Sequence, residues 1–306
     1  MTVVVAGASG HLGRRVAEIL LGQIAPSELV LSTRTPEALE DLAARGAVVR
    51  HGDYSRPETL AEAFGGGKTL LLVSATDLER RVAQHRAAVE AAAAAGIERI
   101  VYTSGLRPEP ANPAVVAASH HATEQAVIES GVAWTFLRNS LYANFQVADA
   151  VRCLAAGTFV HNRGDGRVAY VSREDCAAAA AAVLSTSGHE QVAYDITGPA
   201  AFSAAELASL YTELGGRPIE VVDLDDETFK AGIIGDATGD DHLVYGAGLV
   251  TSFGRSIREG YQSACTNAVA ELTGREPRAL RDVLEARREE LLAAAVTQRG
   301  PSGPQP

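Results

Sequence analysis

The chain has 306 residues, of which 46% are hydrophobic and 21% charged, as expected for a globular protein with a sizeable core. A formal net charge of -11 argues against nucleic-acid phosphates or an anionic membrane surface as partners, because either would need a basic patch. The sequence starts directly with an apolar strand, and no stretch reaches transmembrane length. We therefore expect a cytoplasmic protein with neither of those partners.

Short apolar runs alternate with longer amphipathic stretches in the first half of the chain. The glycine-rich start of a helix over 12–21 follows the first run, and Thr35-Pro36 and Ser55 with Pro57 are further helix-start signals. Because the strands are apolar throughout, they predict a parallel sheet covered on both faces. The predicted strands are 3–5, 29–31, 47–50, 69–74, 99–103 and 134–138.

The pattern changes after about residue 150. A hairpin is predicted over 159–170 around Gly164-Asp165-Gly166, short strands over 192–197 and 219–223, and a helix after the capping box Ser203-x-x-Glu206. The fold class is therefore α/β, a Rossmann-type doubly wound parallel sheet with a smaller α+β C-terminal lobe. We expect an NADP(H)-binding Rossmann domain over 1–150, a smaller substrate-binding lobe over 151–295 and a flexible tail over 296–306. The sequence leaves open whether part of 151–295 adds a strand to the Rossmann sheet.

The segment between the first strand and the first helix carries a dinucleotide-binding pattern. Glycines there permit a tight turn and close approach of a pyrophosphate, and the free N–H groups and dipole of the helix start favour its negative charge. A purely structural turn is the alternative. The candidate cofactor-binding residues of this turn are Gly7, Ser9, Gly10, His11, Leu12 and Gly13.

The end of the second strand indicates which nicotinamide cofactor is bound. It reads Ser32-Thr33-Arg34, without the carboxylate that would bind the ribose hydroxyls, so Arg34 can pair with a 2′-phosphate, assisted by Arg14 or Arg15. A solvated surface arginine is the alternative. We therefore expect NADPH/NADP+. Other candidates follow strands at the sheet edge where ligands bind, although ordinary loop polarity would also explain them: Asp53, Tyr54, Ser74, Ala75 and Thr103.

Several motifs extend over most of the chain: Arg81-x-x-Gln84-His85, Val101-Tyr102-Thr103-Ser104, Thr123-Glu124, Leu137-Arg138-Asn139, the stretch 157–175 and the stretch 271–275. With them the chain resembles the NmrA-like family of atypical short-chain dehydrogenases/reductases, and most of all its quinone-oxidoreductase branch. The resemblance implies a Rossmann fold, NADP(H) binding and reduction of quinones, aryl dyes or related conjugated compounds. The family also contains redox-sensing regulators without turnover.

The chain lacks the Tyr-x-x-x-Lys pair with which standard short-chain dehydrogenases protonate a substrate oxygen. Its only lysines are Lys68 and Lys230, and no tyrosine precedes either by four positions. At the expected place stand His120 and Glu124, one helical turn apart, and the resemblance implies a similar histidine and glutamate in quinone-reducing relatives. His120 is therefore the candidate proton donor or orienting group, with a structural histidine as the alternative.

The missing pair indicates the class of acceptor. Reduction of an isolated ketone gives an alkoxide, whose basicity is close to that of hydroxide from water with a pKa of about 15.7, so an acid is needed. Reduction of a quinone gives a phenolate-type anion with a parent pKa of about 10, which solvent can protonate. The sequence thus favours an aromatic or quinone substrate, or a hydroxylated aromatic ketone.

The remaining site candidates follow the fifth and sixth strands or lie late in the chain. Ser104 and Tyr142 join His120 as catalytic candidates, and the substrate-binding candidates are Asn139, Tyr142, Asn144, Phe145 and Tyr245. Phe145 fits an interlobe core almost equally well, and Tyr245 follows a loop over 235–241 that could be part of a lid. No metal site is expected, because His120-His121 has no partner at zinc spacing.

Three functions remain open from the sequence. The first is an NADPH-dependent reductase that transfers hydride to a quinone or similar conjugated carbonyl compound. The second is a ketoreductase acting on an aromatic polyketide, and the third is an NADP(H)-sensing regulatory protein without turnover. A homodimer is a further expectation.

Overall fold

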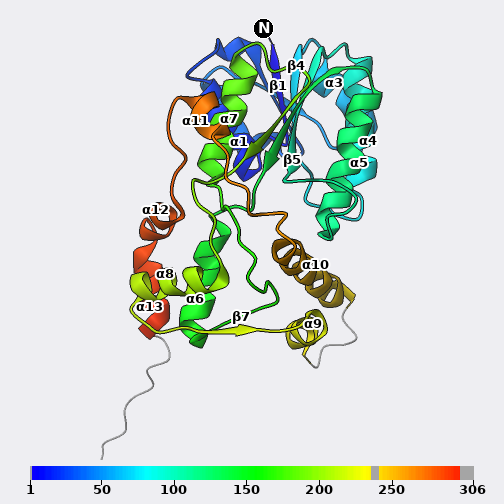
Figure 1. The fold of residues 1–306 in the computed structure, drawn as a ribbon. Coiled ribbons are helices and arrows are strands. Elements are labelled where there is room, and N and C mark those ends of the chain that lie inside the picture. The colour runs from blue at the N-terminus through cyan, green and yellow to red at the C-terminus, as the bar shows by residue number, and fades with distance from the viewer. Residues whose placement is uncertain (1, 236–240, 297–306) are drawn as a thin grey trace, which may run out of the picture.

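The computed structural model describes residues 2–235 and 241–296, and its larger part is built on a seven-stranded sheet (Figure 1). All neighbouring strands are parallel, in the order β3-β2-β1-β4-β5-β6-β8. The strands are β1 (Val3–Ala6), β2 (Leu29–Thr33), β3 (Val48–His51), β4 (Thr69–Leu72), β5 (Arg99–Gly105), β6 (Ala133–Asn139) and β8 (Val192–Ile196).

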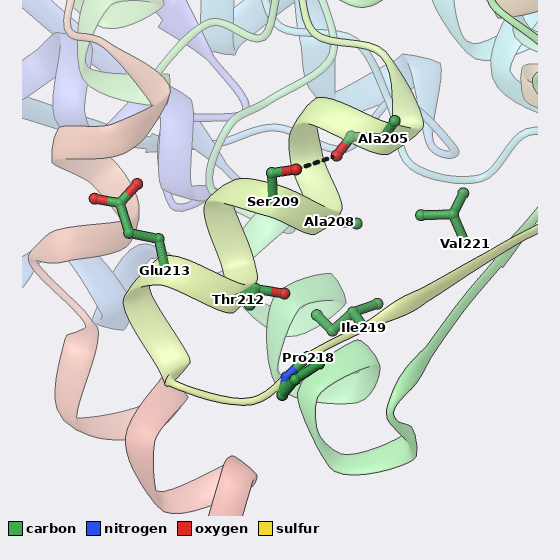
Figure 2. Close-up of a pocket in the computed structure, with 8 residues that line it drawn as sticks. All are labelled: Ala205, Ala208, Ser209, Thr212, Glu213, Pro218, Ile219 and Val221. Carbon is green, nitrogen blue, oxygen red and sulfur yellow. Dashed lines mark hydrogen bonds between the residues drawn. The ribbon is translucent and has the colours of Figure 1, made fainter.

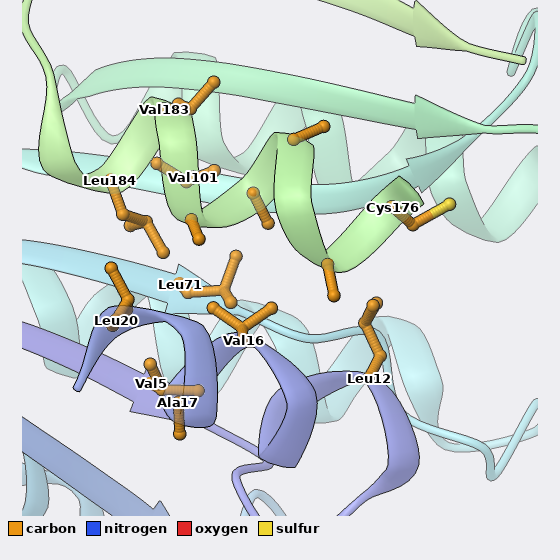
Figure 3. Packing of buried hydrophobic residues seen from close by; sticks show 14 of the residues in the cluster. Val5, Leu12, Val16, Ala17, Leu20, Leu71, Val101, Cys176, Val183 and Leu184 are labelled. Atoms are coloured by element: carbon orange, nitrogen blue, oxygen red, sulfur yellow. The ribbon is translucent and has the colours of Figure 1, made fainter. Parts of the chain in front are cut away.

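Helices cover both faces of this sheet. One face packs against α1 (His11–Leu20), α7 (Arg173–Ser185) and α11 (Ala268–Thr273), and the other against α3 (Leu60–Phe64), α4 (Arg81–Ala94) and α5 (Val115–Glu129). Figure 3 shows the first face, where Val16 of α1 and Val183 of α7 lie over Val101 and Leu71 of the sheet. Because both faces are covered, strands such as β1 and β4 are buried along their whole length, as their continuous apolar sequences predict.

Short helical segments complete the connections in the first half. Each begins at a proline whose fixed φ suits the first helical position. They are the 3-10 turns η1 (Pro26–Glu28), η2 (Pro36–Leu39) and η3 (Pro57–Thr59), and the second is followed by α2 (Glu40–Ala44). The predicted helix starts at Thr35-Pro36 and Ser55 with Pro57 are thereby confirmed as the place where the chain becomes helical.

The second lobe has a hydrophobic core of its own, formed mainly by α6 (Phe145–Ala156) and α8 (Ala204–Gly215). The capping box predicted at Ser203 and Glu206 is confirmed at the start of α8. A two-stranded parallel sheet, β7 (Thr158–His161) with β9 (Glu220–Asp223), lies beside this core. The remaining helices are α9 (Asp226–Ile234), α10 (Asp241–Arg258), α12 (Leu280–Glu285) and α13 (Arg288–Val296).

The predicted hairpin over 159–170 is wrong. Gly166 turns against α10, where a Cβ would lie only 2.3 Å from the carbonyl oxygen of Ile257. The chain that follows bonds to Phe202 through Val168 instead of returning along β7. The partner of β7 is β9, about sixty residues later, which turn chemistry alone does not reveal.

The strand predicted over 192–197 belongs to the large sheet and not to the smaller lobe. It follows α7, which packs on α1, and pairs in parallel with β6 as the second strand of a β-α-β crossover. The boundary at residue 150 stays a prediction, because α7 and β8 lie beyond it in sequence. The loop within 236–240 and the tail over 297–306 lie outside the described residues.

Candidate active site

A crevice is expected where the strand order of a doubly wound sheet reverses, which in this chain is between β1 and β4. The glycine turn lies at that point. Gly7 has a φ of +78°, a left-handed conformation that suits glycine. A Cβ on Gly13 would lie 2.4 Å from the carbonyl oxygen of Gly7, so the start of α1 packs directly on the turn. The glycines are therefore required by the backbone path itself.

The N-terminus of α1 has unused hydrogen-bond donors. Gly10 caps the helix without a side-chain hydrogen bond, and the N–H groups of His11, Leu12 and Gly13 donate to no atom within the described part of the chain. Four such N–H groups begin every helix, and their positive potential suits an anion. This end of the crevice therefore fits the pyrophosphate of a dinucleotide.

Ser9 connects the glycine turn to the end of β2. Its hydroxyl accepts hydrogen bonds from Thr33 (2.7 Å) and Thr35 (3.3 Å), which flank Arg34 in sequence. Arg34 itself is exposed and has no hydrogen bond or ion pair to any residue that the structure describes. Its guanidinium is therefore available for a phosphate beside the turn.

Arg14 and Arg15 are not available in the same way. Arg14 forms ion pairs with Glu18 and Asp41. Arg15 binds Glu174 of α7 through two nitrogens, each 2.7 Å from a carboxylate oxygen. Both arginines are thus paired with carboxylates whereas Arg34 is not, and their assistance to Arg34 stays a prediction.

The two candidates after β3 differ in position: one side chain lies at the glycine turn, and the other is bonded within its own loop. The Asp53 carboxylate accepts the N–H of Ser55 at 2.9 Å and so closes the turn into η3. The hydroxyl of Tyr54 donates to the carbonyl of Val73 at 3.2 Å and would lie 3.7 Å from a Cβ on Gly7. Tyr54 thus lies at the glycine turn, whereas the carboxylate of Asp53 is engaged in its own loop. Both assignments stay predictions.

The loop after β4 is held in place by two side chains. Thr103 accepts the N–H of Ser74 at 2.9 Å, and Nε2 of His85 accepts the N–H of Ala75 at 2.9 Å. Since Nε2 is the acceptor, the ring proton of His85 is on Nδ1, which donates to the hydroxyl of Thr123 at 2.9 Å. Burial lowers the pKa of His85 to about 3, so the ring is neutral. Through its two hydrogen bonds it connects the loop after β4 to α5.

His120 lies on α5 and is 9% exposed. Its Nδ1 lies 2.8 Å from the hydroxyl of Tyr102. That hydroxyl also interacts with Thr123, but the Thr123 hydroxyl already donates to the Ser119 carbonyl and accepts from His85, so we assign Tyr102 as the donor to Nδ1. The proton of the neutral ring is then on Nε2, which has no bonding partner in the structure. Burial, with a smaller contribution from the positive charge of Arg81, lowers the pKa of His120 to about 3. His120 can therefore donate a hydrogen bond at neutral pH, but it is not an imidazolium acid.

Glu124 does not share a hydrogen bond with His120. Its two carboxylate oxygens bind Arg138 of β6, at 3.0 Å from Nε and 2.7 Å from Nη2. The carboxylate is nearly fully buried, and breaking such a pair leaves an uncompensated charge. Glu124 therefore connects α5 to the sheet.

Two further candidates lie at the ends of β5 and β6, which pair so that Ser104 is beside Arg138 and Gly105 beside Asn139. The Ser104 hydroxyl and the Oδ1 atom of Asn139 are fully buried without a hydrogen-bond partner among the described residues. An unsatisfied buried polar group costs about 1–3 kcal/mol. Their roles stay predictions.

The substrate-side loop forms a small aromatic cluster. Tyr142 and Phe145 lie with ring centroids 5.9 Å apart, and the guanidinium of Arg173 lies 5.4 Å from the first ring and 5.7 Å from the second. Phe145 is 62% exposed, so it is not part of an interlobe core. Asn144 accepts the backbone N–H of Arg173 at 2.9 Å and thus stabilises the start of α7. Tyr245 lies on α10 and is 41% exposed.

Three residues near the crevice were not assigned a role from the sequence: His85, Tyr102 and Arg173. His85 and Tyr102 belong to motifs that carry the family resemblance, but a motif does not reveal that one ring supports a loop and the other orients His120. Arg173 is at the first position of α7, and only the fold brings it to the aromatic pair.

A separate hollow in the second lobe has no such features (Figure 2). Small side chains of α8 line it, among them Ala205 and Ala208, together with Ile219 and Val221 of the β9 region. Glu213 at its edge pairs with Arg281. Because no described catalytic candidate lines this hollow, the crevice at the strand ends is the candidate active site.

Comparison with known proteins identifies the family of this chain. A family model described as NAD(P)H-binding matches residues 7–187. Quinone oxidoreductase 2 of Escherichia coli is 36% identical over 231 residues, which cover 76% of this chain and 80% of that protein. An NmrA-like family domain-containing oxidoreductase of Aspergillus flavus is 30% identical over 294 residues, covering 93% and 94%.

The chain belongs to the NmrA-like, NAD(P)H-binding family. Solved structures give the same fold. The Escherichia coli NADPH-dependent quinone oxidoreductase complexed with NADPH has a TM-score of 0.87 and 32% identity, covering 94% of this chain and 99% of that one. Citrobacter triphenylmethane reductase complexed with NADP(H) has a TM-score of 0.82 and 31% identity, with the same coverage. The predicted family and Rossmann-type fold class are confirmed.

Two searches within residues 2–235 and 241–296 bear on other kinds of site. No helix there is both long and apolar enough to cross a membrane. No cluster of three or more histidine, cysteine or acidic side chains there could hold a metal ion.

Proposed function

We propose that this chain is an NADPH-dependent reductase that transfers hydride to a quinone or a similar conjugated aromatic carbonyl compound. As a member of the NAD(P)H-binding family with oxidoreductase relatives, it is an NAD(P)H-dependent oxidoreductase. The observation that carries the choice of acceptor is that the candidate proton donors of the acceptor end, His120 and Tyr142, are not ready to give up a proton at neutral pH. His120 is an uncharged donor there, burial raises the pKa of Tyr142, and the sequence has no Tyr-x-x-x-Lys pair.

The residues at the glycine turn fit the cofactor. The free N–H groups of α1 would hold the pyrophosphate, and Arg34 would pair with the 2′-phosphate. Tyr54, Ser74 and Ala75 would border its remaining length. When bound, the dinucleotide supplies a hydride, that is, two electrons and one proton.

The acceptor end supplies orientation more than acid chemistry. Tyr142 and Phe145 offer aromatic faces on which a flat acceptor can stack, and Arg173 keeps these rings together. The Nε2–H of His120 is placed to donate a hydrogen bond to an acceptor oxygen. Because a reduced quinone oxygen is a phenolate with a parent pKa of about 10, water can complete its protonation.

An NADPH oxidation assay with a benzoquinone, a naphthoquinone and a polycyclic aromatic ketone tests this function. We expect turnover of the quinones. The names of two relatives, quinone oxidoreductase 2 of Escherichia coli and NAD(P)H azoreductase of Xenophilus azovorans, support conjugated acceptors. Turnover of the ketone alone would favour the aromatic-polyketide ketoreductase. Tight NADPH binding without oxidation of any acceptor would favour the sensing regulator.

A cytoplasmic location and a homodimer are also part of this proposal. Fractionation of cells that express the full chain would test the first. Light scattering during size-exclusion chromatography would test the second, and a mass of one chain would reject the dimer.

A further inference from the structure

Arg81 is a buried cation without an acidic partner. It is 8% exposed, and it uses two nitrogens on neutral acceptors: Nε donates to the carbonyl of Ala75 at 2.7 Å and Nη1 to the hydroxyl of Ser119 at 3.3 Å. No carboxylate among the side chains that the structure describes forms an ion pair with it. Other buried charges are paired, for example Glu124 with Arg138 and Asp175 with Arg275. Since burying an unpaired charge is costly, a partner outside the chain would explain Arg81.

The third nitrogen of Arg81 is open. Nη2 has no acceptor among the residues described, and it is not one of the fully enclosed unpartnered atoms, so solvent reaches it. The guanidinium connects the loop after β4 to the turn of α5 that precedes His120. Its charge lowers the pKa of both His85 and His120, and it interacts electrostatically with Tyr245 of α10. A charged donor and the neutral Nε2–H donor of His120 thus lie at the same end of the crevice.

We propose that Arg81, with the Nε2–H of His120, stabilises the oxygen anion that forms on the acceptor during reduction. This inference rests on the proposed function. Two electrons and one proton enter the quinone as hydride, the ring becomes aromatic, and the result is a hydroquinone monoanion. Its oxygen then takes one proton from water. Arg81 supplies a fixed positive charge where a Tyr-x-x-x-Lys pair would otherwise supply a proton, so the site selects acceptors whose reduced oxygen can remain an anion.

The kinetic test uses Arg81→Gln, with Arg86→Gln as a matched control, because Arg86 is exposed on the same helix and has no described contact. The acceptors are para-benzoquinones whose hydroquinones differ in acidity. If Arg81 stabilises the anion, Arg81→Gln should lower kcat about 100-fold for the quinone whose hydroquinone is least acidic. The loss should be smaller for quinones whose hydroquinones are more acidic. Arg81→Lys keeps a charge and should recover part of the loss. The Kd for NADPH should change less than threefold.

The binding test uses 4-nitrophenol, a phenol that changes absorbance when it ionises, with enzyme saturated by NADP+. In the wild type the bound phenol should have a lower pKa than the free phenol, and Arg81→Gln should raise the pKa of the bound phenol by about one unit, a tenfold change in ionisation. Because the wild-type measurement needs no variant, it can reject the inference even if Arg81→Gln does not fold, and Arg81→Lys then tests whether the effect belongs to this side chain. A wild-type bound pKa at or above the free value overturns the inference.

Three kinetic results would also overturn it. An equal loss of kcat for every quinone would indicate that Arg81 only holds the Ala75 loop. A large rise in the Kd for NADPH with unchanged kcat would assign Arg81 to the cofactor, and unchanged kinetics would leave it without a role. If the wild type reduces no quinone at all, the proposed function fails, and the 4-nitrophenol titration still tests the anion site separately.

Discussion

The two ends of the crevice are built in different ways. The dinucleotide end is made of consecutive residues, Gly7 to Gly13, and its hydrogen-bond donors are backbone N–H groups at the start of one helix. The acceptor end is made of side chains from α4, β5 and α5, which tertiary packing brings together. A backbone site depends on the path of the chain, whereas a side-chain site depends on burial. The two ends should therefore fail under different changes.

Electrostatics separates the ends in the same way. At the dinucleotide end the N–H donors have no partner among the described residues and Arg34 is exposed, so a charged ligand can pair with groups that are not already engaged. At the acceptor end burial keeps His85 and His120 neutral and leaves Arg81 as the charged group. The dinucleotide end is therefore suited to binding phosphates. The acceptor end is suited to stabilising the negative charge that forms on an initially neutral acceptor when it is reduced.

The largest expected effect comes from the backbone at the dinucleotide end. Gly13→Ala places a Cβ within 2.4 Å of the Gly7 carbonyl oxygen and 3.0 Å of the Ala8 Cα, both backbone atoms that cannot turn aside. The turn must move, and we expect NADPH affinity to fall about 100-fold, measured by calorimetry. The control is Gly22→Ala after α1, whose Cβ would meet only ordinary contact at 3.4 Å. Equal losses in the two variants would contradict the reason given.

A smaller effect is expected from the side chain at the same end. Arg34→Gln removes one charge-assisted contact to a 2′-phosphate, which predicts about a 20-fold loss of NADPH affinity. NADH lacks that phosphate, so its affinity should change less than twofold. The control is Arg45→Gln, because Arg45 is another exposed arginine whose side chain has no described contact. If Arg34→Gln lowers the affinities for NADPH and NADH by the same factor, Arg34 does not bind the 2′-phosphate.

The sheet could be predicted from sequence where local pattern and structure coincide. The first six strands were located to within two residues at every end, because continuous apolar runs between helix signals leave little choice. The hairpin over 159–170 failed, and the sequence left open which part of 151–295 returns to the large sheet, since both depend on which distant segment supplies the pairing partner. The partner of β7 is β9, and the partner of β8 is β6.

The site follows the same division. The glycine turn and the exposed Arg34 are visible in sequence because neighbouring residues and strand order define them. The neutral state of His120 could not be predicted, since it depends on burial and on the positive charge of Arg81, which only the fold brings near. The ion pairs of Arg14 with Asp41 and of Arg15 with Glu174 could not be predicted for a related reason, because the partners meet only in the folded chain.

The smallest expected effect tests burial at the acceptor end through pH. The pKa of His85 in the folded chain is about 3, against 6.5 for a free histidine, so below pH 6.5 protons bind the unfolded chain but not the folded ring. The contribution of neutral His85 to stability is thus complete above pH 6.5 and is lost as pH falls towards 3. One unit below 6.5, at pH 5.5, the loss is about 1.4 kcal/mol, or tenfold in the unfolding constant.

His85→Gln removes this titration while its side-chain oxygen can still accept the Ala75 N–H. Urea unfolding at pH 7.5 and pH 5.5 should therefore show that the variant loses less stability on acidification than the wild type does, by about 1.4 kcal/mol. The other histidines with lowered pKa, among them His120, contribute equally to both proteins and cancel in the difference. Identical losses would mean that His85 titrates normally in the fold. The loop after β4 would then rest on a charged ring, and a second cation beside Arg81 would remove the contrast between the two ends.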